Sequence, residues 1–316
     1  MAIPGRLERQ EGRFALVDGI PFALPVNCAR SPALFAVFPI DAERAKALLP
    51  GNEIHPLRLW KKGLLVVSVI DYRVTDIGKY IEFSIAIACT RGSRPAPPLL
   101  PALLWNPWGT GQFVFDLPVS TEISVKGGRG IWGMPKHQAN LDYVIGDRTV
   151  SSQYDLDGQL CMRIEIDRPA SARLPFSAAA ANYAEFRGML MKSFVHFRGK
   201  VGVSVFRKGS ARLTLGTHPR LAALKELRIE PDPLFTAFVP EANGILDDHC
   251  ESWFLSFPEP PASAPEGLES VVRLGLGEQW LPPPGIPLSK SPSPRSPPQS
   301  RGTTATPGGP GKGAPI

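Results

Sequence analysis

Two side chains carry the clearest potential for covalent chemistry, a lysine in a glycine-rich segment and a glutamate in an apolar run. Lys136 ends the sequence Gly-Arg-Gly-Ile-Trp-Gly-Met-Pro-Lys over residues 128–136, and Glu82 lies among aromatic and β-branched neighbours. An uncharged lysine amine can add to a ketone, lose water and leave a protonated imine that withdraws electrons from neighbouring bonds. The two residue types therefore point to chemistry on carbonyl compounds.

Such chemistry requires an amine without its proton. At the ordinary pKa of about 10.4, only about one lysine side chain in 2,500 is the free base at pH 7. Burial and a nearby positive charge both favour the free base. Trp132 and Met134 flank Lys136 and offer apolar walls. Because a buried strand glutamate without a partner is costly, we expect Glu82 to face the same cavity as Lys136.

Each candidate also has a purely structural interpretation. A Pro-Lys pair is common in solvated turns, so Lys136 alone would indicate little. Arg30 and Arg129 could hold a substrate carboxylate, yet arginines more often form surface ion pairs. His137 follows Lys136 in a predicted strand, where side chains alternate, so it is expected to point away from the cavity. For Trp132, a place in the hydrophobic core is the first expectation, and a place in the wall of a pocket is the second.

The segment 128–137 resembles the part of acetoacetate decarboxylases that carries their Schiff-base lysine. In that family a Gly-Arg-Glu, hydrophobic, aromatic, small, hydrophobic, Pro-Lys-Lys pattern places the nucleophile directly after proline, which corresponds to Lys136. Gly78-Lys-Tyr-Ile-Glu82 is similar to the family's Gly-x-Tyr-x-Glu strand, whose glutamate reaches the catalytic lysine. The resemblance covers roughly residues 20–257.

The sequence departs from the family pattern at several positions. His137 stands where the family has a second lysine, and Gly130 where it has a glutamate. A second active-site glutamate of the family falls near Val67, and Arg30 lies about one position from the family's substrate-contacting arginine. The imine-forming lysine is therefore present, while its usual accessory groups are incomplete.

The resemblance implies a Schiff-base-forming lyase that acts on a β-keto acid or related oxo acid without a cofactor. Lys136 would be the nucleophile and Glu82 the proton-transfer or orienting group. Arg30 or Arg129 would contact the carboxylate, with His137 and Trp132 also at the substrate. An aldolase or dehydratase using the same imine is one alternative. A β-barrel that binds a small ligand without turning it over is another.

Neither a nucleotide site nor a metal site is indicated. Gly128-Arg-Gly-Ile-Trp-Gly133 fits the GxGxxG spacing, but that loop must open a helix, and here Pro135 and strand-like sequence follow. The five histidines show neither HxH nor HExxH spacing. We therefore predict no metal and no cofactor.

Charge and composition limit the classes of binding partner that the sequence favours. Residues 282–316 hold four bases and no acid, which is +4 of the formal +6, so the rest of the chain has 31 bases against 29 acids. Such a body does not favour nucleic-acid binding. Membrane insertion is not expected, because no apolar run approaches the roughly 18–20 residues needed to span a bilayer. Four dispersed cysteines favour the cytoplasm, and the small-molecule substrate and homo-oligomer follow from the resemblance.

The elements that must position these residues are mostly strands. Residues 66–74 and 80–90 are β-branched and aromatic runs, and three alternating runs over 141–145, 149–156 and 160–166 are joined by Gly146-Asp147 and Asp157-Gly158. Asp-Gly between alternating runs is a strong hairpin signal. We predict a further pair between 201–206 and 211–215.

Helices are expected to be few, because the chain has 35 prolines. Asp41 is expected to cap a helix over 42–49 and Thr217 a helix over 217–227. The fold class is therefore mainly β, and the resemblance implies a closed, cone-like antiparallel β-barrel. We predict one domain over residues 1–257, a C-terminal extension over 258–281 and a disordered Pro/Gly/Ser-rich tail over 282–316.

Overall fold

The structure is a computed structural model that describes Gly5 and residues 12–104 and 106–259. The predicted tail over 282–316 and nearly all of the extension over 258–281 lie outside the described residues. The predicted domain boundaries therefore remain predictions.

Strands dominate the described chain, with a few short helices between them. In chain order the elements are β1 (Arg13–Val17), β2 (Ile20–Leu24), β3 (Val26–Asp41), α2 (Ala42–Lys46), β4 (Ile54–Pro56), β5 (Lys62–Tyr72), β6 (Val74–Thr75), β7 (Tyr80–Arg91), α3 (Leu100–Leu103), β8 (Gly111–Val119), α4 (Glu122–Trp132), β9 (Lys136–Gln138), β10 (Asn140–Leu141), β11 (Val144–Ile145), β12 (Thr149–Leu156), β13 (Gln159–Asp167), β14 (Leu174–Phe186), β15 (Met189–Val205), β16 (Ala211–Leu215), η1 (Pro219–Leu221), α5 (Ala222–Lys225) and β17 (Phe235–Phe254).

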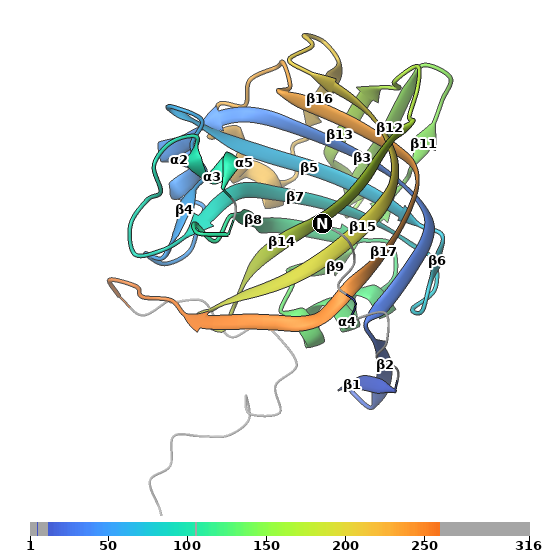
Figure 1. Cartoon of the computed structure of the whole chain (residues 1–316), viewed down its shortest axis with the longest axis horizontal. Coiled ribbons are helices and arrows are strands. Elements are labelled where there is room, and N and C mark those ends of the chain that lie inside the picture. Colours follow the sequence, from blue (N-terminus) through green and yellow to red (C-terminus); the bar gives the residue numbers. More distant parts are fainter. Residues whose placement is uncertain (1–4, 6–11, 105, 260–316) are drawn as a thin grey trace, which may run out of the picture. The chain divides into compact units, whose positions relative to one another are not determined.

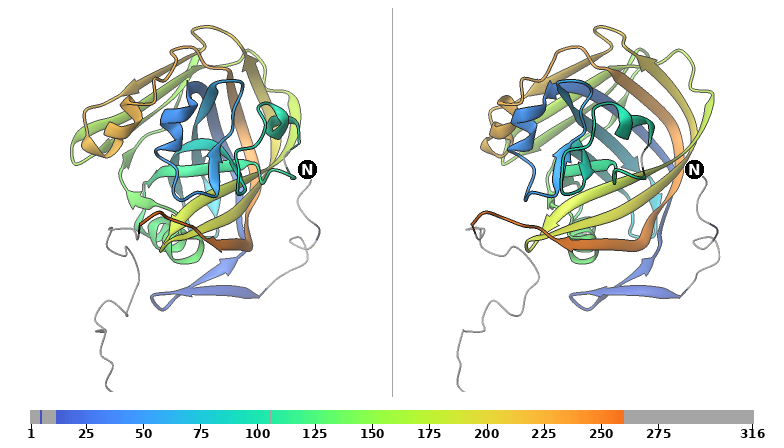
Figure 2. Two further views of the ribbon diagram at one scale, coloured as in Figure 1. Left: turned by 90° about the vertical axis from the view of Figure 1, so that its left-hand side faces the viewer. Right: turned by 60° about the vertical axis from the view of Figure 1, so that its left-hand side comes forward.

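Seven strands close into a barrel. The largest sheet runs β4-β7-β5-β3-β17-β15-β14-β8-β9, and an additional pairing between β7 and β8 joins its two sides. Figures 1 and 2 show these long strands wrapping around one interior. The predicted mainly β barrel is therefore confirmed. Two pairings are parallel rather than antiparallel, β8 with β14 and β8 with β9.

Strands β5 and β7 are buried on both faces, which explains their strongly apolar sequences. Alternate side chains belong to two hydrophobic clusters. One set, which includes Val67 and Phe83, packs outward beneath a second sheet. The other set, which includes Ile70 and Tyr80, faces the barrel interior. Because side chains alternate along a strand, Glu82 projects to the interior between Tyr80 and Ser84.

The second sheet has the order β10-β12-β13-β16, with β11 also paired to β12. Asp157 and Gly158 connect β12 to β13 with φ values of 52° and 74°, as a type I′ turn requires. The predicted pairing of 201–206 with 211–215 is wrong. β16 instead pairs with β13, and the end of β15 pairs with β17.

The helix predictions are confirmed in part. Asp41 caps α2 and accepts hydrogen bonds from the backbone nitrogens of Glu43 and Arg44, although the helix ends at Lys46. Thr217 is not the cap of the later helical segment, because His218 caps η1. α4 was not expected, and it lies with β1 and β2 at one end of the barrel (Figures 1 and 2).

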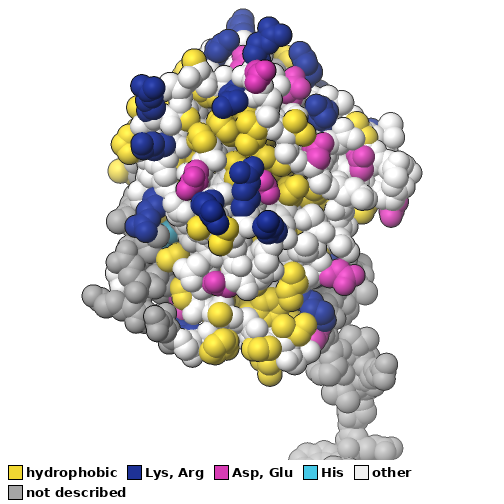
Figure 3. Space-filling model, turned by 90° about the vertical axis from the view of Figure 1, so that its right-hand side faces the viewer, with side chains coloured by type: hydrophobic (Ala, Val, Ile, Leu, Met, Phe, Trp, Pro, Cys, Tyr) yellow, Lys and Arg dark blue, Asp and Glu magenta, His cyan; other side chains and the backbone are white. Residues whose placement is uncertain are grey.

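The surface carries charges of both signs, as the near-neutral composition outside residues 282–316 predicts. On the face in Figure 3, lysine and arginine side chains are interspersed with acidic and apolar ones. Cys28, Cys89 and Cys161 are buried free thiols, whereas Cys250 is exposed. No helix in the described part of the chain has both the length and the apolar character needed to cross a membrane.

Candidate active site

The tight C-terminal end of α4 directs the chain so that the side chain of Lys136 points into the barrel. Gly133 follows α4 with φ of 64° and donates its backbone N–H to the carbonyl of Arg129, while Met134 donates to the carbonyl of Gly128. A left-handed glycine is the common way to end a helix, since it carries no Cβ penalty. Two residues later the chain runs parallel to β8, with Lys136 opposite Leu117. The helix end thus turns the lysine back over α4.

One face of α4 cradles the lysine side chain. A Cβ on Gly128 would lie 2.3 Å from Cδ of Lys136, so the lysine chain occupies the space that any larger residue would fill. One turn earlier, Oγ of the fully buried Ser124 accepts a hydrogen bond from Nζ of Lys136 at 3.0 Å. Residues four apart share one helix face, so Ser124 and Gly128 together fix the path of the side chain.

The lysine is buried and paired. Lys136 is 4% exposed, and its Nζ lies 2.7 Å from Oε2 of Glu82. The ring centroid of Tyr80 lies 5.3 Å from Nζ, and Tyr80 stacks on Tyr72. The contact is short enough for a proton to pass directly between the amine and the carboxylate.

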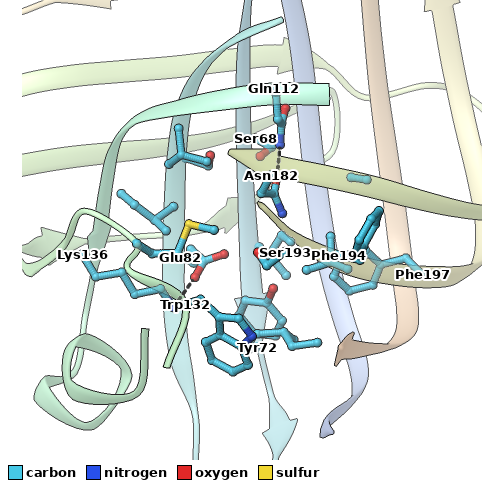
Figure 4. A pocket seen from close by; sticks show the side chains of 18 of the residues that line it. Ser68, Tyr72, Glu82, Gln112, Trp132, Lys136, Asn182, Ser193, Phe194 and Phe197 are labelled. Atoms are coloured by element: carbon cyan, nitrogen blue, oxygen red, sulfur yellow. Dashed lines mark hydrogen bonds and ion pairs between the residues drawn. The ribbon is translucent and has the colours of Figure 1, made fainter. Parts of the chain in front are cut away.

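Both groups open onto an internal cavity of about 100 Å³. Figure 4 shows Lys136 reaching in from one side toward Glu82, with the rings of Trp132 and Tyr72 beyond the pair. In the same view, the polar side chains of Gln112, Ser68 and Asn182 lie on the opposite side of the pair from these two rings. The wall is mostly apolar and aromatic, formed by Phe35, Ile70, Tyr72, Val114, Leu117, Trp132, Met134, Ala180, Phe194, Val195, Phe197 and Leu246.

The predicted apolar neighbours of the lysine form part of this wall. Trp132 and Met134 are buried and line the cavity. The indole nitrogen of Trp132 donates to the backbone carbonyl of Asp247 on β17 at 3.1 Å. This hydrogen bond ties the end of α4 to the barrel wall, so the ring is fixed where a substrate would lie.

The two arginines expected at the substrate carboxylate do not line the cavity. Arg30 is exposed on β3 with φ of 52°, and its backbone nitrogen donates to Oδ1 of Asn243. Arg129 lies on α4, and its Nε donates to the backbone carbonyl of Lys136 at 2.5 Å. Arg129 therefore positions the lysine backbone. Lys136 and Glu82 are the charged residues among those lining the cavity in the described chain.

His137 points away from the cavity into a separate buried network. Its Nε2 lies 2.9 Å from the hydroxyl of Tyr154, and its Nδ1 lies 3.5 Å from Oδ1 of Asp116. Asp116 is 1% exposed, accepts from Tyr154 and also accepts from Nε of Arg220 at 2.8 Å. Burial, the largest influence, lowers the pKa of His137, so its imidazole is neutral at pH 7.

Sequence reasoning missed Ser124, Gln112 and Asn182. Ser124 could not be found without predicting α4. Gln112 and Asn182 line the cavity, joined by a 2.7 Å hydrogen bond, from strands whose pairing is parallel and short. The position of the family's second glutamate near Val67 now has a structural meaning. Val67 faces the outer cluster, while the next residue, Ser68, lines the cavity.

No group of three or more His, Cys, Asp or Glu side chains that could hold a metal ion occurs among the described residues. The acidic and basic groups at the cavity are already paired with each other. The arrangement supports chemistry in which the lysine amine itself is the reactive group.

Comparisons with known proteins identify the fold and the family of this chain. No curated protein sequence matches the chain. A crystal structure of acetoacetate decarboxylase from Legionella pneumophila subsp. pneumophila str. Philadelphia 1 shares 14% identity over 76% of this chain and 88% of that chain, with a TM-score of 0.50. A structure from structural studies of acetoacetate decarboxylase shares 15% identity over 80% of this chain and 98% of that chain, with a TM-score of 0.51.

These structural likenesses show the shared fold. The family itself is shown by the sequence model described as acetoacetate decarboxylase (ADC), which matches residues 16–234 and so includes six of the seven barrel strands, Glu82 and Lys136. The chain therefore belongs to the acetoacetate decarboxylase family.

Proposed function

We propose that this protein is a Schiff-base-forming lyase that acts on a β-keto acid or related oxo acid. Lys136 is the nucleophile and Glu82 transfers protons. The observation that carries the proposal is the buried Lys136–Glu82 contact of 2.7 Å at a mostly apolar cavity. A lysine and a carboxylate in this geometry serve as nucleophile and adjacent base, the arrangement that covalent catalysis requires.

The reaction balances with these two groups and one proton from solvent. The ammonium of Lys136 gives a proton to Glu82, and the free amine adds to the substrate ketone. Glu82 returns that proton to the departing hydroxyl, so loss of water leaves a protonated imine. The electron pair of the bond to the carboxylate moves toward the imine nitrogen, which releases CO₂ and leaves an enamine. Glu82, protonated again from solvent, gives a proton to the enamine carbon, and hydrolysis of the imine frees the ketone and restores the ammonium of Lys136. Each turnover consumes one proton and the electron sink is the imine.

The substrate carboxylate has one cationic neighbour in this scheme. Arg30 and Arg129 lie outside the cavity lining, so the positive charge beside the carboxylate is the imine nitrogen formed on Lys136. Loss of CO₂ then removes both charges together, which is favourable in a buried, mostly apolar site.

An aldolase or dehydratase using the same imine is the second candidate. The observation that favours it is the neutral polar wall formed by Ser68, Ser84, Gln112, Asn182 and Ser193, since hydroxyl-bearing intermediates of those reactions need hydrogen-bond partners. The first steps are shared, and the two functions differ in which bond breaks after the imine has formed.

Borohydride reduction tests the shared step. With acetoacetate, pyruvate and longer oxo acids, reduction is expected to add the ligand mass to the peptide that contains Lys136. Lys136→Met should abolish labelling, whereas Lys126→Met should not. Lys126 is the control, a lysine on the neighbouring helix α4 that is paired with Asp18 and 41% exposed. A CO₂-release assay on the same panel then separates the decarboxylase from the aldolase or dehydratase.

Absence of labelling at Lys136 across the whole panel would contradict the proposal and favour a barrel that binds a ligand without chemistry. The homo-oligomer and the cytoplasmic location remain predictions. Light scattering of the purified chain tests the first, and fractionation of the native cells tests the second.

A further inference from the structure

We propose that the cavity selects oxo compounds that carry a second, uncharged hydrogen-bonding group, which binds at the amides of Gln112 and Asn182. This inference rests on the proposed function, because it concerns the part of the same cavity beyond the Lys136 imine. It names a substrate class: ketones with a hydroxyl, carbonyl or amide group on the arm that points away from the reacting bond.

The polar residues of the cavity follow the order of the barrel strands. The closed barrel runs β5-β7-β8-β14-β15-β17-β3. Five consecutive strands each contribute one neutral polar side chain, and the remaining two contribute apolar ones. We call the first set the polar arc, and its members are Ser68 on β5, Ser84 on β7, Gln112 on β8, Asn182 on β14 and Ser193 on β15; Leu246 on β17 and Phe35 on β3 face them.

Strand register arranges the polar arc in two groups of direct neighbours, one on β5 and β7 and the other on β8, β14 and β15. Ser68 is directly opposite Ser84 across β5 and β7. Asn182 is directly opposite both Gln112 and Ser193 in its two neighbouring strands. Directly opposite residues have Cβ atoms about 4.5–5.5 Å apart, so one small ligand group can reach several members at once.

The amide pair has unused hydrogen-bonding capacity. Nε2 of Gln112 donates to Oδ1 of Asn182 at 2.7 Å, which leaves the Asn182 nitrogen and the Gln112 oxygen for another partner. Figure 4 shows the Asn182 nitrogen turned away from Gln112, toward the side where Ser193 and Glu82 lie. The amide pair can therefore both donate to and accept from one ligand group.

The serines of the polar arc support the same conclusion. Ser68, Ser84 and Ser193 are 5–7% exposed, and their hydroxyls make no side-chain hydrogen bond within the described part of the chain. Buried hydroxyls in proteins nearly always have a partner. A polar ligand group, or water in its absence, supplies that partner here.

Charge decides which group binds. The polar arc contains no cation, and the nearest charged pair, Lys136 with Glu82, is neutral overall. A carboxylate at the arc would be buried without a counter-ion, which is costly. An uncharged hydroxyl, carbonyl or amide needs hydrogen bonds alone. An oxo acid therefore places its carboxylate beside the imine and its other, uncharged arm against the arc.

Three methyl ketones of matched length test the proposal: 2-hexanone, 6-hydroxy-2-hexanone and 5-oxohexanoate. Borohydride labelling of Lys136 in the full-length protein is measured against concentration. The hydroxy ketone is expected to half-saturate labelling at about 3- to 10-fold lower concentration than the other two, as one or two neutral hydrogen bonds provide. Asn182→Leu should abolish this preference. Phe35→Leu, on the apolar side, should preserve it.

Equal half-saturation by the hydroxy ketone and 2-hexanone, or tightest labelling by 5-oxohexanoate, would overturn the proposal. So would a preference that survives in Asn182→Leu. If Asn182→Leu does not fold, Ser84→Ala, which removes a single hydroxyl, should reduce the preference instead.

Failure of the proposed function is distinguishable from failure of this inference. If no ketone labels Lys136, the imine chemistry is wrong. In that case, ligand-observed NMR can measure the non-covalent binding of the same three ketones to Lys136→Met. This measurement still tests the polar arc. Tighter binding of the hydroxy ketone supports the inference, and indifference among the three contradicts it.

Discussion

At the scale of single residues, the proposed reaction depends on Glu82. The carboxylate is the acidic group at the cavity lining among the described residues, and it contacts the amine directly. In the proposed reaction, a carboxylate in that position accepts the ammonium proton when the amine attacks and returns it to the departing hydroxyl as water is lost. Without this acceptor, the proton would have to cross a mostly apolar wall.

Replacing Glu82 with glutamine tests this role. Glu82→Gln keeps the size and one hydrogen-bond acceptor but cannot take the proton, so imine formation and turnover are expected to fall about 10²- to 10⁴-fold. Single-turnover borohydride labelling and steady-state assays measure the two effects. Glu43→Gln, at an exposed ion pair with Arg58, is the matched control and should leave both rates unchanged. Equal rates in Glu82→Gln and the wild type would contradict the proton-transfer role.

A second residue-scale prediction concerns Gly128. Gly128→Ala would place a Cβ 2.3 Å from Cδ of Lys136, so the lysine side chain must leave its path between Ser124 and Glu82. Labelling of Lys136 is expected to fall at least 10-fold. Gly130→Ala, two residues along the same helix and exposed, is the control, and it should keep labelling and raise stability by about 0.5–1 kcal/mol. Labelling and thermal unfolding of both variants decide the matter.

The meeting of Lys136 and Glu82 could be predicted from the sequence, whereas the cradle around them could not. The apolar neighbours of Glu82 left few alternatives to a partner at an interior cavity, and the family motif supplied the lysine. Ser124 and Gly128 act through helix α4. Its sequence contains Gly127, Gly128 and Gly130, and each glycine costs a helix about 1 kcal/mol relative to alanine. Packing overcomes that preference, and local sequence does not reveal it.

At the scale of elements, the position of Lys136 depends on β9 and on the network behind it. β9 is three residues long and pairs with β8. His137, the residue after the lysine, contacts Tyr154 of the second sheet and faces Asp116. Asp116 also accepts hydrogen bonds from Tyr154 and Arg220. These contacts hold the lysine strand between the barrel and the second sheet. The network thereby links the stability of this junction to the site.

The network makes stability depend on pH. Burial lowers the pKa of His137, opposed by Asp116 and assisted by Arg220 and Arg129. As pH falls through about 6.5, the unfolded chain binds a proton that the folded protein does not, so the free energy of unfolding decreases. Urea unfolding between pH 7.5 and 5 should show a smaller decrease in His137→Gln than in the wild type.

Two comparisons bound this effect. His55 is also buried and its pKa is also lowered mainly by burial, so part of the pH dependence should remain in His137→Gln. His249 is half exposed, and His249→Gln serves as the control for the substitution itself. A pH dependence in His137→Gln as steep as that of the wild type would show that this imidazole is not responsible.

Strand boundaries and pairing could be predicted where a turn motif connects two strands. The pairing of a strand without such a motif could not. Asp157-Gly158 fixed the β12–β13 hairpin because few other residues adopt two successive positive φ values. β16 has no comparable signal. Its predicted partner was the end of β15, its neighbour in sequence, but its apolar residues are buried better against β13 in the second sheet.

At the scale of the whole barrel, burial on both faces explains why residue patterns alone identify the class of fold, whereas its closure was predicted from the family resemblance. Strands β5 and β7 separate the cavity from the second sheet, so they read as continuous apolar runs with single polar residues facing inward. Closure depends on β8, which pairs with β7 on one side and with β14 on the other. The pairing of β8 with β14 is parallel and covers two residue pairs, which is too short for a sequence pattern to predict.

Gly111 lies at this closing seam and tests it. A Cβ there would lie 2.6 Å from the backbone oxygen of Ala181 and 2.8 Å from the ring of Tyr183, so the two strands must separate to admit a side chain. Gly111→Val is expected to destabilise the protein by about 1–3 kcal/mol in urea unfolding. Because Gln112 follows directly, the variant should also weaken the preference for hydroxy ketones. Gly92→Ala, whose added Cβ meets ordinary contacts, should change neither property, and an unaffected Gly111→Val would mean that the barrel does not depend on this seam.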